Sequence, residues 1–161
     1  MKAINLFLLS ALIGIELILG IIVAPTIFYP KDIIGEGILS HFQSGLMMTH
    51  IFIKFGYILL FISFFNFFYE CYCFFKNKIK FQIRFSKLIL SLLILILSLL
   101  FVFYFSDYIA EQQRILGDQV IQNNEFKSMH SASEVVLKII IIMQIILYFL
   151  SFKIEKNTKI I

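Results

Sequence analysis

The sequence predicts an all-α integral membrane protein, a four-helix transmembrane bundle with both termini in the cytoplasm. Two observations carry this fold class. Hydrophobic residues make up 60% of the 161 residues and charged residues only 15%, more apolar surface than a soluble domain of this length can bury. Long apolar runs alternate with short polar segments, and each run approaches the roughly 20 residues that cross a bilayer. The length fits a single membrane domain.

Four apolar runs qualify as spans, and they cover about residues 4–28, 46–70, 87–106 and 133–152. The first run follows Lys2 in the manner of a signal peptide, but it is too long for one. In addition, Pro25 directly follows Ala24, the only small-residue cleavage candidate. We therefore interpret this run as a retained membrane span.

Basic residues gather on one side of the predicted bundle. Nine of the 14 Lys and Arg residues belong to the amino terminus, the loop 76–87 or the carboxyl-terminal tail. The segments 29–45 and 106–130 carry three basic and six acidic residues. The positive-inside rule places the termini in the cytoplasm and these two segments outside, as in a multi-pass protein of the inner (cytoplasmic) membrane. Because the basic residues adjoin apolar runs, nucleic acid is not expected as a partner.

Local signals predict that two helices begin in the outer segments. Ser40 and Gln43 have the spacing of a capping box, which predicts that the second helix begins near His41. Asn124 is a candidate cap for the fourth helix.

Other signals predict where the remaining helices bend or end. The third helix can continue through residues 107–116 until Gly117 stops it. Pro25 is expected to bend the first helix near its outer end, and Tyr29-Pro30 to terminate it.

Ionisable side chains interrupt three of the four spans, although such a group in the bilayer is costly and usually faces the bundle interior. Glu16 lies in the middle of the first span, and Lys54 and Lys138 lie near its depth on the second and fourth. We predict an outward-opening polar seam between the first, second and fourth helices, while the third contributes packing. Its members are Glu16, His50, Lys54, His130, Ser133, Glu134 and Lys138.

A structural interpretation of the same residues is also open. Intramembrane ion pairs can simply fix the register of neighbouring helices, and Lys54 and Lys138 can extend to the outer interface. Nearer the cytoplasm, Glu70 is expected to form an interfacial salt bridge with Lys76 and the basic loop.

Methionine and histidine side chains form the only metal-like group in the sequence. Met47, His50, Met129 and His130 all fall on the outward side, and thioether with imidazole ligands would suit copper. A haem would need paired histidines, for which His50 and His130 are the only candidates. These are minor alternatives, and otherwise no cofactor is expected. No nucleophile–base pair is evident, so the sequence does not suggest an enzyme.

Three segments resemble the bacterial domain-of-unknown-function 4149 family, which is related to the transmembrane protein 205-like proteins. The stretch GIELILGIIVAPTIF ends in a small-Pro-x-x-Phe element made by Ala24, Pro25 and Phe28. Residues 42–45, and the segment from Phe126 through His130 to Ser133, are similar to two further family elements. Lys138 replaces an Asn that usually follows that serine. The resemblance implies a four-span membrane protein without an established activity, and it favours Glu16, Pro25, His130 and Ser133 as site residues.

Two function hypotheses follow. The leading one is a non-enzymatic membrane protein whose seam binds or passes an ion or a small polar solute, with Glu16 as the central acid. The alternative is a structural or assembly partner of another membrane complex. Besides the lipid bilayer, the expected partners are a second copy of the chain in a homodimer or another membrane protein.

Overall fold

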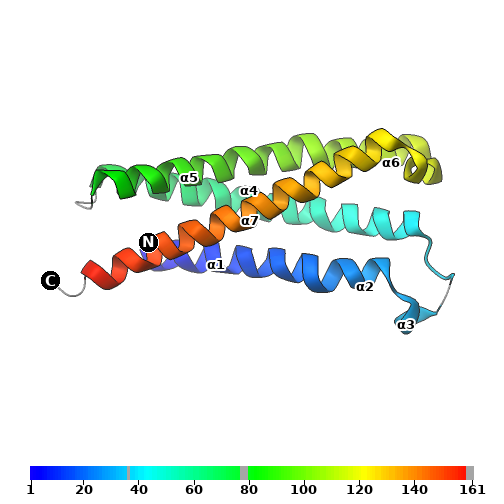
Figure 1. Cartoon of the computed structure of the whole chain (residues 1–161), viewed down its shortest axis with the longest axis horizontal. Coiled ribbons are helices and arrows are strands. Elements are labelled where there is room, and N and C mark those ends of the chain that lie inside the picture. The colour runs from blue at the N-terminus through cyan, green and yellow to red at the C-terminus, as the bar shows by residue number, and fades with distance from the viewer. Residues whose placement is uncertain (36, 77–79, 159–161) are drawn as a thin grey trace.

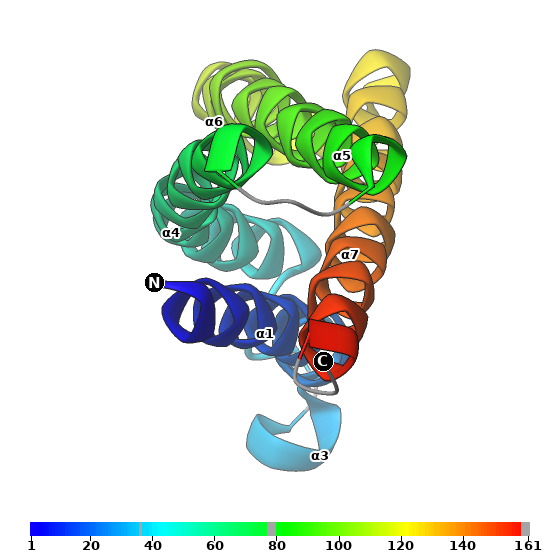
Figure 2. The same cartoon turned by 90° about the vertical axis from the view of Figure 1, so that its left-hand side faces the viewer.

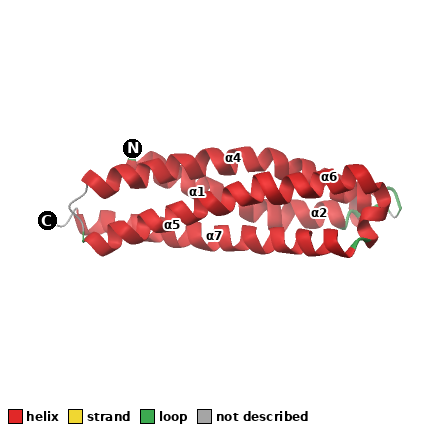
Figure 3. Ribbon diagram, turned by 90° about the horizontal axis from the view of Figure 1, so that it is seen from above, coloured by secondary structure: helices red, strands yellow, loops and turns green. Residues whose placement is uncertain are grey.

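In the computed structural model the described chain consists of helices and the short connections between them, with no strand among the described residues (Figures 1 and 3). The structure describes residues 1–35, 37–76 and 80–158, except for the side chains of 32 and 153–158. Some charges counted in the predicted asymmetry therefore lie outside the described residues, among them those of Glu36, Lys78 and Lys159. The helices are, in order, α1 (Lys2–Ile18), η1 (Leu19–Val23), α2 (Ala24–Phe28), α3 (Lys31–Ile34), α4 (His41–Lys76), α5 (Phe81–Leu100), η2 (Phe101–Ser106), α6 (Asp107–Leu116), η3 (Gly117–Gln122) and α7 (Asn124–Thr158).

Four continuous rods are long and apolar enough to cross a membrane, and they confirm the predicted four-helix membrane bundle. They run over Lys2–Phe28, His41–Lys76, Phe81–Gln122 and Asn124–Phe152. Seen end-on, the rods form a ring in the order α1, α4, α5, α7, so that α4 lies diagonally across from α7 (Figure 2). We call the end where α1 begins and α4 ends the terminal end, and the opposite end, with α3 and η3, the loop end (Figure 1).

The predicted helix starts are largely confirmed. The Ser40 backbone N–H donates to Gln43 Oε1 at 2.9 Å and the Gln43 N–H donates to Ser40 Oγ at 3.1 Å, which is a complete capping box. The fourth span is capped one residue earlier than predicted. There, Oδ1 of Asn123, not of Asn124, accepts the N–H of Phe126 at 3.1 Å, because the capping residue must lie outside the helix that it caps.

The predicted helix ends are also found. Gly117 ends α6 with a φ of 53°, a left-handed conformation that glycine adopts without steric cost. At the end of α2, Tyr29 leaves the helical conformation and Pro30 follows. Pro25 was predicted to bend the first helix, and a π-helical turn, η1, directly precedes the short helix α2 that contains it. A proline cannot donate the usual backbone hydrogen bond, and a wider turn accommodates that loss.

A layer of leucine side chains fills the middle of the bundle. Leu12, Leu59 and Leu147 come from three different rods and are at most 1% exposed. Where α4 passes η2, a Cβ on Gly56 would lie 2.8 Å from Val102 Cγ2, so glycine permits the close approach. This apolar layer separates the polar groups of the terminal end from those of the loop end.

Toward the terminal end the interior is polar again. Lys87 Nζ lies 2.9 Å from Glu70 Oε2 with both side chains buried, and Asn66 Nδ2 donates to Asn5 Oδ1 at 3.1 Å. The predicted salt bridge between Glu70 and the basic loop is found, with Lys87 of that loop as the partner. Lys76 does not take part, and the pair is buried because α4 turns Glu70 inward. Lys76 instead donates to the hydroxyl of Tyr72.

Candidate functional site

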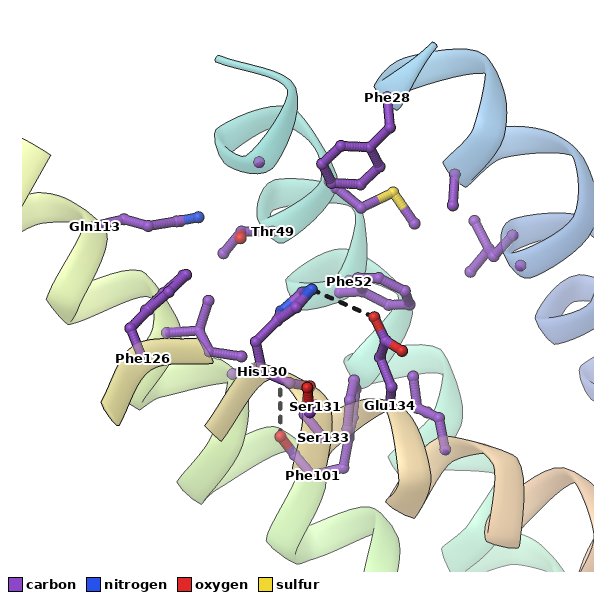
Figure 4. Close-up of a pocket in the computed structure, with 18 of the residues that line it drawn as sticks. Phe28, Thr49, Phe52, Phe101, Gln113, Phe126, His130, Ser131, Ser133 and Glu134 are labelled. Carbon is purple, nitrogen blue, oxygen red and sulfur yellow. Dashed lines mark hydrogen bonds and ion pairs between the residues drawn. The ribbon is translucent and has the colours of Figure 1, made fainter. Parts of the chain in front are cut away.

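A cavity of about 680 Å³ opens inside the loop end of the bundle, and all four rods line it (Figure 4). One wall comes from the outer part of the first rod and another from the start of α4. The third rod contributes η2, α6 and η3, and the first turns of α7 complete the enclosure. Both π-helical turns, η1 and η2, border the cavity through Leu19, Gly20, Phe101 and Ser106. Such turns interrupt regular helices most often at functional sites.

The floor of the cavity carries a buried acid. Glu16 of α1 is 5% exposed, and its Oε1 accepts a hydrogen bond from Gln144 Nε2 of α7 at 3.1 Å. Within the described residues, Glu16 Oε2 and Gln144 Oε1 have no hydrogen-bond partner and no salt bridge to Glu16 is present. The register set by the Asn5–Asn66 and Ile27–Ser44 hydrogen bonds places Glu16 level with Phe55.

A second charged group lies along α7 nearer the mouth of the cavity. Glu134 forms ion pairs with two neighbours on α7. Its Oε1 lies 3.4 Å from His130 Nε2, and its Oε2 lies 3.6 Å from Lys138 Nζ. The side chains of Glu134 and Lys138 are more than half exposed. Figure 4 shows His130 reaching toward the centre of the cavity and Ser133 turned back to donate to the His130 carbonyl at 2.7 Å. The predicted seam residues of the first and fourth spans thus share one cavity.

The two seam residues predicted on the second span do not join them. His50 and Lys54 are exposed on α4, and neither lines the cavity. Two features of the bundle explain the error. Lys54 is one residue away from the inward-facing Phe55, so the helix turns it to the outer surface, and α4 lies diagonally across from α7. An outward-facing lysine can extend its ammonium group toward the membrane interface, as the structural interpretation of Lys54 allows.

The third rod contributes more than the predicted packing. Gln113 of α6 is buried against the cavity, and Ser106 lines it while its hydroxyl donates to the Phe101 carbonyl at 2.9 Å. Thr49 of α4 also reaches the cavity (Figure 4). The sequence did not predict that Gln113 faces the cavity. The π turn η2 lies between the apolar run and Gln113, so the regular helical period does not give the direction of its side chain.

The predicted copper ligands do not meet at one centre. Met47 and His50 are exposed on α4 and do not line the cavity, which receives Met48 and His130 instead. Met129 is half-buried one residue before His130. His50 and His130 likewise lie on diagonal rods, which does not fit the paired haem ligands considered above. Over the described residues, no three His, Cys, Asp or Glu side chains are grouped as a metal site.

The family-like segments meet at the cavity. Ala24 and Phe28 line it, whereas Pro25 is exposed at the start of α2. Phe28 contacts the His41 ring at a centroid distance of 5.3 Å, and Ser44 Oγ donates to the Ile27 carbonyl at 2.8 Å, which joins α2 to α4.

A family model described as domain of unknown function (DUF4149) matches residues 7–116. The chain belongs to the DUF4149 family. The matched range holds the first three rods up to the end of α6, and therefore Glu16, the small-Pro-x-x-Phe element and Gln113. Comparison with curated proteins and with solved structures gave no match.

Beyond the DUF4149 match lies α7, which supplies Gln144, His130, Glu134 and Lys138. The acid on the cavity floor is thus in the matched region, and its hydrogen-bond donor is outside it. The similarity of the segment from Phe126 to Ser133 to the family stays a resemblance.

Proposed function

We propose that this membrane protein is a non-enzymatic binding protein or carrier, whose loop-end cavity takes up a small polar molecule or ion with Glu16 as the central acid. The observation that carries the proposal is the Glu16 carboxyl group on the cavity floor. It is buried, one of its oxygens has no hydrogen-bond partner among the described residues, and it borders a space of about 680 Å³. Such a costly group in a membrane protein is usually functional.

The shape of the interior favours binding over an open pore. Leu12, Leu59 and Leu147 each lie one helical turn nearer the terminal end than Glu16, Phe55 and Gln144 respectively. Because these leucines are fully buried, they close the route below the floor. A solute that enters the cavity would therefore be held at Glu16, and passage would require the leucine layer to part.

The hydrogen bonds at the mouth support a non-enzymatic role. A serine nucleophile needs a base within hydrogen-bond reach of its hydroxyl. Ser133 Oγ instead donates to the backbone carbonyl of His130, while His130 Nε2 faces Glu134. These three side chains are therefore not arranged for acyl transfer.

The proposal includes an orientation with the loop end outside the cell, supported by the excess of basic residues at the terminal end. A cysteine replacing Glu111 on α6, in a chain whose Cys71 and Cys73 are changed to Ala, should react with a membrane-impermeant maleimide in intact cells. A cysteine replacing Lys76 should react only after the membrane is permeabilised. The opposite labelling pattern would contradict this orientation.

Binding can be tested with purified protein in lipid nanodiscs and a panel of small probes: K⁺, acetate, methylammonium, benzyl alcohol and benzylamine. At least one probe should raise the unfolding temperature and bind saturably. Thr49→Phe, which fills the cavity from α4, should lose that binding. His50→Phe places the same bulk on the outer surface and should retain it. If no probe binds wild type better than Thr49→Phe, the proposed function is wrong.

A further inference from the structure

We infer that the cavity selects a small organic ammonium cation with an apolar body, its ammonium group held by Glu16 above the Gln144 amide. This inference rests on the proposed function and deepens it by naming the ligand class. Glu16, Gln144 and the aromatic side chains around them carry it.

Both atoms without a hydrogen-bond partner at the floor are oxygens within the described residues. Gln144 Nε2 is already used by Glu16 Oε1, which leaves Glu16 Oε2 and Gln144 Oε1 without donors within the described residues. A buried acceptor without a donor is costly, more so when it is charged. The matching chemistry is a group that carries several N–H donors and a positive charge. An ammonium group has three such donors and an anion or a neutral ether has none.

Three phenylalanine side chains line the cavity near the floor. Phe55 is level with Glu16, Phe52 lies one turn further along the cavity, and Phe101 approaches from η2. The Phe52 ring meets Phe101 edge-on at a centroid distance of 6.0 Å and Phe55 at 6.5 Å. Aromatic rings attract a cation within about 6 Å of the ring centre, and they also pack against an apolar body.

These features favour an organic cation over a metal ion. Hard inorganic cations need about six oxygen ligands at short distance, whereas the floor offers one carboxyl and one amide. The volume of about 680 Å³ is within the range of drug-sized ligand sites and is mostly walled by apolar side chains.

Lys138, one of the two lysines that line the cavity, does not take the place of such a ligand. Lys138 lies six residues, or about 9 Å along the helix, from Gln144 toward the mouth. Its ammonium group pairs with Glu134 at 3.6 Å and is mostly exposed. Lys138 therefore pairs with Glu134, and within the described residues Glu16 is left without a cationic partner.

The test compares matched probes by titration in nanodiscs. Benzylamine should bind wild type at least tenfold more tightly than benzyl alcohol, which has the same ring without the charge. It should also bind more tightly than methylammonium, which lacks the apolar body. Glu16→Gln keeps an oxygen for the Gln144 donor and should bring benzylamine down to the affinity of benzyl alcohol. Glu111→Gln removes the same charge from the exposed surface of α6, outside the cavity, and should preserve the preference.

The outcomes separate this inference from the function on which it rests. If benzyl alcohol or acetate binds in a Thr49→Phe-sensitive manner without a preference for benzylamine, the ammonium inference is overturned and the cavity remains a binding site. The same conclusion holds if the preference survives in Glu16→Gln. If K⁺ alone binds, the site is an inorganic ion site. If nothing binds, both proposals fail together.

Discussion

Replacing Lys87 with Met is expected to lower the free energy of unfolding by about 3–5 kcal/mol, the usual cost of removing one partner from a buried ion pair. Lys87 and Glu70 lie 2.9 Å apart with side chains at most 9% exposed, and Glu70 Oε1 has no other partner within the described chain. The variant leaves the Glu70 carboxylate buried and uncompensated. Unfolding in mixed micelles with increasing SDS would measure the loss.

Two controls separate the charge from the side-chain volume. The double variant Lys87→Met with Glu70→Leu removes both charges and should recover most of the lost stability. Arg114→Met breaks an exposed pair, since Arg114 lies 4.0 Å from Glu111 on α6, and should cost at most about 1 kcal/mol. Equal losses for Lys87→Met and the double variant would mean that shape, and not charge, is what the pair supplies.

Leu59→Ala is expected to destabilise the bundle by about 2–5 kcal/mol, the range for leucine truncation in a close-packed interior. Leu59 is 0% exposed and packs in the layer that closes the cavity floor. The truncation removes favourable packing contacts that lipid cannot replace, because lipid does not reach this position. Thermal unfolding in nanodiscs would report the loss.

Ile58 is the matched control for Leu59 because it is the preceding residue on α4 and is 45% exposed. Its side chain faces outward, where lipid can fill the space, so Ile58→Ala should change stability by about 0.5 kcal/mol or less. A similar loss for both variants would contradict a specific role for the buried leucine layer.

Much of the fold could be predicted because the deciding signals are local. Run length identifies the four spans, the Ser40–Gln43 pair identifies a helix start, and Gly117 identifies a helix end. The order of the helices around the bundle is not local. No property of a single span showed that α4 and α7 are diagonal. The predicted grouping of Lys54 with Glu134 and Lys138 in one seam required these two helices to be neighbours.

The candidate site was predicted only in part for a related reason. Glu16 was identified because a mid-span acid must face the interior, and the charged stripe of α7 follows the helical period. The same reasoning gave the wrong position for Lys54, because a lysine near an interface can reach water from an outward-facing position. Glu70 and Lys87 form the opposite case, since both were assigned to the interface and both are buried.

The two π-helical turns bordering the cavity set the direction in which the side chains of the following helices, α2 and α6, point. A π turn takes one more residue than an α turn, so it shifts the rotational phase of everything after it by about 100°. If residues 101–106 formed regular α turns instead, Gln113 would be rotated by about 100° away from its place at the cavity, with the apolar span left intact. The extra residue in each π turn therefore changes which side chains of the following helix face the bundle interior. It lets the membrane half of a helix and its outer half satisfy separate requirements, one set by lipid and the other by the enclosed space.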